Sequence, residues 1–144
     1  MTEERPWRAI DPPELAEPIG YANAVESRGG RRITLAGQVA MDRTGAVIHR
    51  GDLPAQAELV FRNLATVLEH AGARPEHLVR MRFFVTDIPA YKAASKAIGA
   101  AYRKHFGRWF PAMTLVQVVR LYDEGAMLEV EAEAVVPDPA DTRP

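Results

Sequence analysis

A strict alternation of side chains in residues 127–136 is the feature that most limits how this chain can fold. The segment reads MLEVEAEAVV, in which Glu129, Glu131 and Glu133 alternate with small or aliphatic residues. Successive side chains of a β-strand point to opposite faces, so a period of two predicts a strand that is covered on one face only. The fold must therefore contain a sheet with one apolar, packed face and one face that carries a row of carboxylates.

The row of glutamates needs an electrostatic explanation, because like charges on one face repel one another. Arg80 and Arg82 lie two residues apart on a second predicted strand, 78–86, and they could pair with the glutamates across the sheet. Two interpretations of this face stay open. It is either a solvated acidic stripe or a surface covered by another subunit.

Two segments have the pattern of helices that could cover the apolar face. Asp52 is placed as an N-cap with Pro54 in the first turn, and Gly72 stands where a C-cap is expected. Between them, apolar residues recur at helical spacing: Leu59, Val60, Leu64, Val67 and Leu68. The same start signal recurs as Asp87-Ile88-Pro89 and predicts a second helix with these inward residues: Tyr91, Ala94, Ile98, Ala101, Tyr102 and Phe106.

The remaining strands complete an α+β domain. Residues 19–27 and 32–40 are predicted to form a hairpin around the glycine pair at 29–30, and residues 113–120 precede a turn at 121–125. The order ββ-α-β-α-ββ predicts a sheet with two helices packed on one face. Proline-bearing ends predict an irregular N-terminal segment at 1–18 and a flexible tail at 137–144, which leaves one domain at 19–136.

Composition excludes several classes of function. The chain has 144 residues, a formal net charge of -1 and no cysteine. A broad nucleic-acid surface needs clustered positive charge, and disulfides or Cys-based metal sites need cysteine. The glycines form no nucleotide-binding motif, the histidines no metal motif, and no apolar run approaches the ~20 residues of a membrane span. We therefore expect a cytoplasmic protein without metal, cofactor, nucleic-acid or membrane partner.

The order and spacing of several motifs resemble the RidA/YjgF family, many of whose members are enamine/imine deaminases. The resemblance covers residues 18–136 and rests on PIGYANAV, ITLAGQVAMDRTGAV, GDLPAQAELVFRNLATVLEHAGA, FFVTDIPAY, the FP-A element before strand 113–120, and LEVEAEAVV. It implies a chorismate-mutase-like α+β fold. It also implies a barrel-forming homotrimer with three small-molecule clefts between adjacent subunits.

The resemblance also implies a set of site residues. The deaminase motif Pro-Ala-Arg-Ser, often followed by cysteine, corresponds here to Pro111-Ala112-Met113-Thr114-Leu115, so Met113 stands in place of the arginine that grips a substrate carboxylate. Glu129 matches the glutamate that positions the attacking water, although spacing alone does not separate it from Glu131. The other matches are cleft residues: Tyr21, Gly37, Gln38 and Ser95, the last at a position where many deaminases carry asparagine.

Methionine at position 113 changes the chemistry that we expect. A thioether cannot bind an anion, and hydrogen bonds to charged groups contribute ~1.5–3 kcal/mol each. A floor of Met113 and Leu115 suits an apolar or aromatic imine or enamine, with Glu129 still handling water. The alternatives are a non-catalytic trimeric binding or interaction protein and, more remotely, a ribonuclease or translation inhibitor.

Two further points stay open from the sequence. An arginine from elsewhere could replace the missing clamp, and four are candidates by position: Arg31, Arg32, Arg108 and Arg120. Trp109 and Phe110, just before Pro111, either wall an apolar cleft or pack at an interface.

Overall fold

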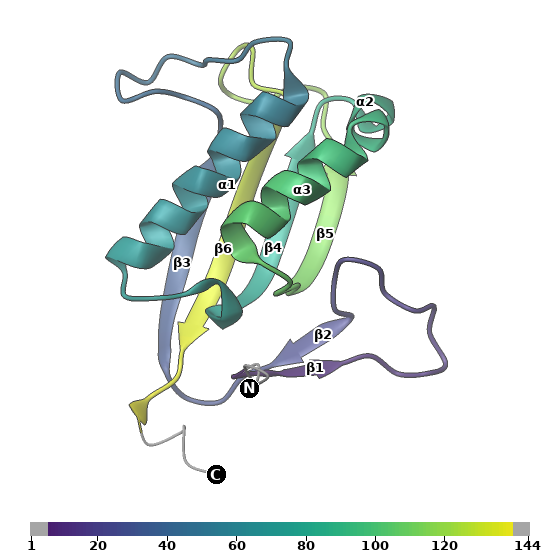
Figure 1. The fold of residues 1–144 in the computed structure, drawn as a ribbon, viewed down its shortest axis with the longest axis vertical. Coiled ribbons are helices and arrows are strands. Elements are labelled where there is room, and N and C mark those ends of the chain that lie inside the picture. Colours follow the sequence, from purple (N-terminus) through teal and green to yellow (C-terminus); the bar gives the residue numbers. More distant parts are fainter. Residues whose placement is uncertain (1–5, 140–144) are drawn as a thin grey trace.

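The computed structural model describes residues 6–139, and within them it forms a four-stranded sheet with helices on one face (Figure 1). The elements in chain order are β1 (Arg8–Ile10), β2 (Ala24–Glu26), β3 (Arg31–Gln38), α1 (Leu53–His70), the 3-10 turn η1 (Pro75–His77), β4 (Leu78–Val85), α2 (Ile88–Ala93), α3 (Ser95–Phe106), β5 (Ala112–Gln117) and β6 (Leu128–Val136). The predicted α+β architecture is confirmed. Within residues 6–139, no helix is both long and apolar enough to cross a membrane.

The main sheet is mixed, with strand order β3-β6-β4-β5. β6 runs antiparallel to both of its neighbours, whereas β4 and β5 are parallel. β5 therefore lies at one edge, and the chain must pass over β4 to reach β6. The predicted strand 113–120 ends early, at Gln117, whose side chain accepts a hydrogen bond from the backbone N–H of Ile88 at the start of α2 (2.9 Å).

The alternation in β6 has the predicted consequence for the two faces of the sheet. Leu128, Val130, Ala132 and Ala134 are buried beneath the helices, and the glutamates between them face the other way. Arg82 lies opposite Glu131 in the register, and the two side chains form an ion pair of 2.9 Å. The predicted pairing across the sheet is thus confirmed for Arg82. Arg80 lies opposite Glu133 in the same register.

The predicted hairpin at residues 19–40 is wrong. β2 pairs with β1 in a separate two-stranded sheet, and β3 pairs with β6. Gly29 and Gly30 have positive φ angles as a turn requires, but a Cβ on Gly30 would lie 2.5 Å from the carbonyl oxygen of Val136. The turn is therefore packed against the end of β6 and directs β3 along that strand. Part of the N-terminal segment predicted to be irregular forms β1, and residues 140–144 of the predicted tail lie outside the described residues.

The predicted helix starts at Asp52 and Asp87 are confirmed, but two other features of the helices differ from the prediction. Asp52 caps α1 and Asp87 caps α2, each accepting a hydrogen bond from a backbone N–H three residues later. The second predicted helix is broken at Ala94 into α2 and α3. Val67, predicted on the inward face of α1, is 39% exposed, whereas Leu64 and Leu68 are buried.

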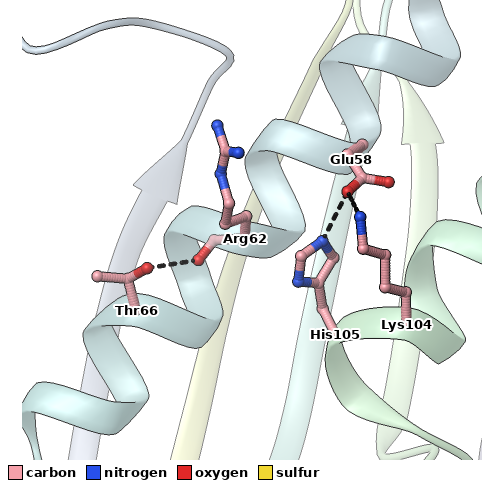
Figure 2. A network of polar contacts seen from close by, with 5 residues as sticks. All are labelled: Glu58, Arg62, Thr66, Lys104 and His105. Atoms are coloured by element: carbon pink, nitrogen blue, oxygen red, sulfur yellow. Dashed lines mark hydrogen bonds and ion pairs between the residues drawn. The ribbon is translucent and has the colours of Figure 1, made fainter.

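A cluster of polar side chains joins α1 to α3 on the outer surface (Figure 2). Glu58 of α1 accepts hydrogen bonds from Lys104 (2.6 Å) and His105 (3.1 Å) of α3. About two turns further along α1, the Thr66 hydroxyl donates to the backbone carbonyl of Arg62 and makes no link between the helices. The hydrogen bond from Lys104 and then that from His105 hold the pKa of Glu58 below its usual 4.5.

The replacement Glu58→Gln is expected to reduce the free energy of unfolding at pH 7 by ~0.2–1 kcal/mol, the range for exposed ion pairs. Because the pKa of Glu58 is lower in the folded state, its contribution is complete above about 4.5, the unfolded pKa, and is lost as the pH falls through the folded value. Urea unfolding at pH 7 and pH 3 checks this difference. Glu69→Gln, on the same helix and without an ion pair in the described residues, is the control, and equal effects of both changes would contradict the prediction.

Candidate functional site

A cleft of about 790 Å³ opens on the helix side of the sheet, between α3 and the edge strand β5. Most of its wall is aromatic or aliphatic, and the loop before β2 contributes one side. The lining residues are Ile19, Gly20, Phe61, Phe83, Tyr91, Ser95, Ile98, Gly99, Tyr102, Arg103, Arg108, Phe110 and Met113. A concave, largely apolar space with a few polar groups is the usual form of a small-molecule site.

The segment that leads into β5 is held firmly against α3. Tyr102 donates a hydrogen bond from its hydroxyl to the backbone carbonyl of Trp109 (2.6 Å), and its ring stacks on Phe110 with centroids 5.3 Å apart. The buried Pro111 accepts a hydrogen bond at its carbonyl from the N–H of Ala22, which ties the loop before β2 to the same strand. Phe110 therefore walls the cleft, whereas Trp109 lies outside its lining.

Met113 is placed in the cleft by the register of β5. It lies opposite Met81 of β4, whose side chain is buried under the helices, so both point to the helix side of the sheet. Leu115 shares this face and packs against the core without lining the cleft, and Ser95 at the start of α3 lines it. Two of the predicted site residues, Met113 and Ser95, are thus brought together here.

Glu129 lies on the opposite face of the sheet. It is paired in register with Phe84, which alternates with the buried Phe83 and Val85 on β4. Within a single chain, Glu129 and Met113 therefore lie on opposite faces of the sheet and do not share one cleft. The pairing of β5 with β4 decides this point, because a shift of one residue in register would exchange the two faces.

Gly37 and Glu129 are in close contact on this uncovered face. A Cβ on Gly37 would clash with Oε1 of Glu129, so a larger residue there would displace the carboxylate. A bulge in β3 between Leu35 and Gln38 shapes this approach. The Gln38 side chain turns back to the carbonyl of Ala36 at 3.5 Å. Gly37 and Glu129 are therefore brought together on the face away from the Met113 cleft, and Gln38 follows Gly37 on β3, where it is paired in register with Val130.

The start of β6 is fixed by a buried glutamine of α1. Gln56 is fully buried, and its amide donates to the carbonyl of Gly125 (3.0 Å) while its carbonyl accepts from the N–H of Met127 (2.8 Å). These bonds hold the chain two residues before Glu129. No pattern in the sequence indicated this role, because Gln56 stands among residues of an ordinary amphipathic helix.

The structure separates the two glutamates that spacing could not. Glu131 is neutralised by Arg82, whereas Glu129 has no hydrogen bond or ion pair within residues 6–139. Burial, and then the nearby charges of Asp123 and Glu131, raises the pKa of Glu129 above its usual 4.5. A partly desolvated carboxylate with a raised pKa is suited to proton transfer, which favours Glu129 as the functional carboxylate.

The last two predicted residues lie at the edge of β5. Tyr21 and Thr114 line a smaller hollow of about 260 Å³ together with Asn23, Arg80 and Met113. Met113 is shared by this hollow and the larger cleft. The described residues include no group of three or more His, Cys, Asp or Glu side chains placed to hold a metal ion.

The replacement Gly37→Ala is expected to push the Glu129 carboxylate toward solvent, because the added methyl group takes its place. The pKa of Glu129 should then fall toward 4.5, since burial is the largest cause of its rise. Carbon-detected NMR titration of the side-chain carboxyl measures this shift. We expect a loss of about 1 kcal/mol in folding stability from overpacking.

A double substitution provides the control. In a Glu129→Ala background the clash is absent, so Gly37→Ala should cost little further stability. An unchanged pKa of Glu129 in the single variant, or an equal stability loss in both backgrounds, would contradict the contact.

Comparison with known proteins identifies the fold and its relatives. Residues 14–136 match the family model described as Endoribonuclease L-PSP. Protein DfrA of Myxococcus xanthus is 33% identical over 129 residues, which cover 89% of this chain and 95% of that protein. A protein of Dermatophagoides farinae named 2-iminobutanoate/2-iminopropanoate deaminase is 30% identical over 133 residues, covering 91% and 98%.

A solved structure has the same arrangement of elements. The Rid-family protein YyfB of Yersinia pestis, described as of unknown function, superposes with a TM-score of 0.81 at 34% identity. The match covers 91% of this chain and 99% of that chain. The family model, which spans residues 14–136, includes every residue that lines the cleft.

Proposed function

Because this chain belongs to the RidA/YjgF family, we propose that it is a homotrimeric RidA-like protein that hydrolyses a small apolar or aromatic imine or enamine in clefts between subunits. The observation that carries the proposal is the carboxylate of Glu129, which lies against Gly37 with a raised pKa and without a partner in the described residues. The relative named as a 2-iminobutanoate/2-iminopropanoate deaminase supports the reaction type.

The need for more than one subunit follows from the two faces of the sheet. Met113 lines a cleft on the helix side, and Glu129 lies on the uncovered side. A bound molecule can meet both only if the Glu129 face of one copy lies against the cleft edge of another. The uncovered face is suited to such contact, because it carries the internally neutralised Arg82–Glu131 pair and the exposed aliphatic Val116 of β5.

Hydrolysis at this site would proceed through a series of proton transfers. Glu129, ionised, takes a proton from water as the oxygen forms a bond to the carbon of the protonated imine and the C=N electron pair moves to nitrogen, which gives a neutral carbinolamine. Glu129 then returns this proton to the amino nitrogen. Ammonia leaves as the carbon–oxygen double bond forms, and the hydroxyl proton passes to Glu129, which releases it to solvent. An enamine first takes a proton on carbon to give the imine. General acid–base catalysis of this kind typically contributes ~10²–10⁴-fold in rate.

The apolar character of the substrate follows from Met113. Its thioether offers no anion contact at the position where the similar family motif has arginine. The wall around it is formed largely by aromatic rings, including Phe83 and Phe110. Such a wall favours a ring or branched chain over the small body of 2-aminoacrylate.

A substrate comparison tests the proposal. Freshly generated 2-aminoacrylate and an aromatic imine are each supplied to the purified protein, and release of ammonia is followed above the spontaneous rate. We expect turnover of the aromatic imine to exceed that of 2-aminoacrylate. Efficient turnover of 2-aminoacrylate, or a monomer at micromolar concentration by light scattering, would contradict the proposal.

One observation favours a second candidate, a non-catalytic trimeric binding protein. Within one chain, the cleft and Glu129 lie on opposite sides of the sheet, so the cleft can hold a ligand without the carboxylate. If neither imine turns over and Glu129→Gln leaves ligand affinity unchanged, this candidate replaces the enzyme.

A further inference from the structure

Positive charge lies in the wall of the large cleft, at positions outside the family motif. Arg103 of α3 and Arg108 of the following segment both line it. Of the residues described as lining the cleft, none is acidic, and neither arginine forms an ion pair within residues 6–139. The cleft therefore combines apolar walls with two guanidinium groups whose charge is not neutralised.

Two glycines account for the position of these arginines. Gly99 lies one helical turn before Arg103, and a Cβ there would be 3.4 Å from Nη1 of Arg103. The guanidinium thus lies along α3 over the surface that Gly99 leaves bare. Gly107 ends α3 with a φ of 66°, a left-handed conformation that favours glycine, and the turn brings Arg108 back to the cleft.

The other polar groups of the cleft are compatible with an anion. The Tyr102 hydroxyl already donates to the carbonyl of Trp109. Burial raises the pKa of Tyr91 above its usual 10, so its phenol stays neutral and adds no negative charge. Ser95 contributes a hydroxyl that can donate a hydrogen bond.

We propose that the cleft binds carboxylates that carry an aromatic or branched apolar group, with Arg103 and Arg108 supplying the positive charge for the carboxylate and Met113 packing against the apolar group. Arginine suits this role because its planar fork matches a carboxylate. Of the four arginines that the sequence suggested as replacements, the structure brings Arg108 to the cleft and leaves Arg31, Arg32 and Arg120 outside its lining. Arg103 was not among them, since an exposed arginine late in a helix has the pattern of a solvated charge.

The proposal rests on the proposed function only in taking this cleft as the ligand site, and it does not require turnover. Isothermal titration calorimetry with phenylacetate, its neutral isostere phenylacetamide, acetate and phenyl phosphate tests it in the absence of chemistry. The variants are Arg103→Gln, Arg108→Gln and their combination. The matched control is Arg62→Gln, which removes an exposed helical arginine on α1 that forms no ion pair in the described part of the chain.

Wild-type protein is expected to bind phenylacetate at least tenfold more tightly than phenylacetamide, and acetate more weakly than either. Each single variant should lose a large part of this preference, the combination should abolish it, and Arg62→Gln should retain it. Tighter binding of phenyl phosphate than of phenylacetate would overturn the assignment to carboxylates. Equal binding of acid and amide, no binding of either, or a preference that survives in the combined variant would overturn the site.

The outcomes separate this inference from the proposed function. Loss of imine hydrolysis in Glu129→Gln, together with an intact charge preference in the arginine variants, would support the hydrolase and overturn the arginine site. A preference for the acid that depends on the arginines, without any imine hydrolysis, would support the arginine site and overturn the hydrolase.

Discussion

The replacement Glu129→Gln is expected to lower the rate of imine hydrolysis by ~10²–10⁴-fold, the usual contribution of a general acid–base group. Glutamine keeps the size of the side chain and therefore the contact with Gly37. Its amide cannot accept the proton of the attacking water. The loss should appear in kcat, because the side chain lies outside the cleft that takes the apolar part of the substrate.

The pH dependence gives this prediction a second readout. Glu129 must be ionised to act as a base, and its pKa is raised above 4.5. The acid limb of the wild-type rate profile should thus lie above that value and should vanish in Glu129→Gln. Glu131→Gln is the control, since it removes the partner of Arg82 and leaves the Glu129 carboxylate in place. It also removes one of the charges that raise the pKa of Glu129, so the acid limb should persist at a lower pH. Equal losses of rate in both variants would indicate that the total negative charge on this face of the sheet matters, and that Glu129 does not act as a specific general base.

Glu129→Gln should also change folding stability. Although it lowers activity, it should make the fold more stable at pH 7. A raised folded pKa means that Glu129 contributes stability below pH 4.5, and that this contribution is lost as the pH rises through the folded value. At pH 7 the partly desolvated, ionised carboxylate therefore lowers the free energy of unfolding, and a neutral glutamine does not. Glu129→Gln should raise the melting temperature at pH 7 and leave it unchanged at pH 3.5. A decrease at pH 7 would indicate a structural role.

The replacement Phe61→Ala is expected to reduce the free energy of unfolding by ~3–5 kcal/mol, as for other fully buried phenylalanines. Phe61 of α1 is 1% exposed and contacts the rings of Tyr102 and Phe106 of α3 with centroids 5.7 Å apart in each case. Its ring also lies 6.1 Å from that of Phe83 in β4. One side chain thus joins both helices and the sheet, and its removal leaves a cavity that these neighbours cannot close.

Urea unfolding at a fixed protein concentration measures this loss, because association would make stability depend on concentration. Phe61→Leu should cost less, about 1.5 kcal/mol or below, since most of the volume is kept. Val67→Ala is the control on the same helix, where the side chain is 39% exposed. A loss in Phe61→Ala no greater than that in Val67→Ala would show that the cluster is not what holds α1 to α3.

Local patterns in the sequence predicted the features that depend on local chemistry. The alternation around Glu131 assigned the faces of β6, and the same reasoning paired it with Arg82. The caps at Asp52 and Asp87 were predicted because a side-chain acceptor followed by proline marks a helix start. A helix cap depends on residues that lie within one turn of each other. The face on which a strand residue lies follows from the alternation of side chains along the strand.

Features that depend on distant contacts were missed. β2 was assigned to the wrong partner because the turn at Gly30 is fixed by Val136, more than a hundred residues away. The break at Ala94 has no glycine or proline to mark it. In the site, residue types were assigned from the family motif, but their faces depended on the pairing of β5 with β4, which no local pattern encodes.

The placement of Met113 and Glu129 on opposite faces of one sheet has a consequence for how such a protein can diversify. Met113 lies opposite Met81 on the helix side, and the surroundings of Glu129 are Gly37, Phe84 and the neighbouring carboxylates. Within one chain, substitutions at position 113 can therefore reshape the cleft without changing the groups that raise the pKa of Glu129. The two sides of the sheet can thus diverge one mutation at a time.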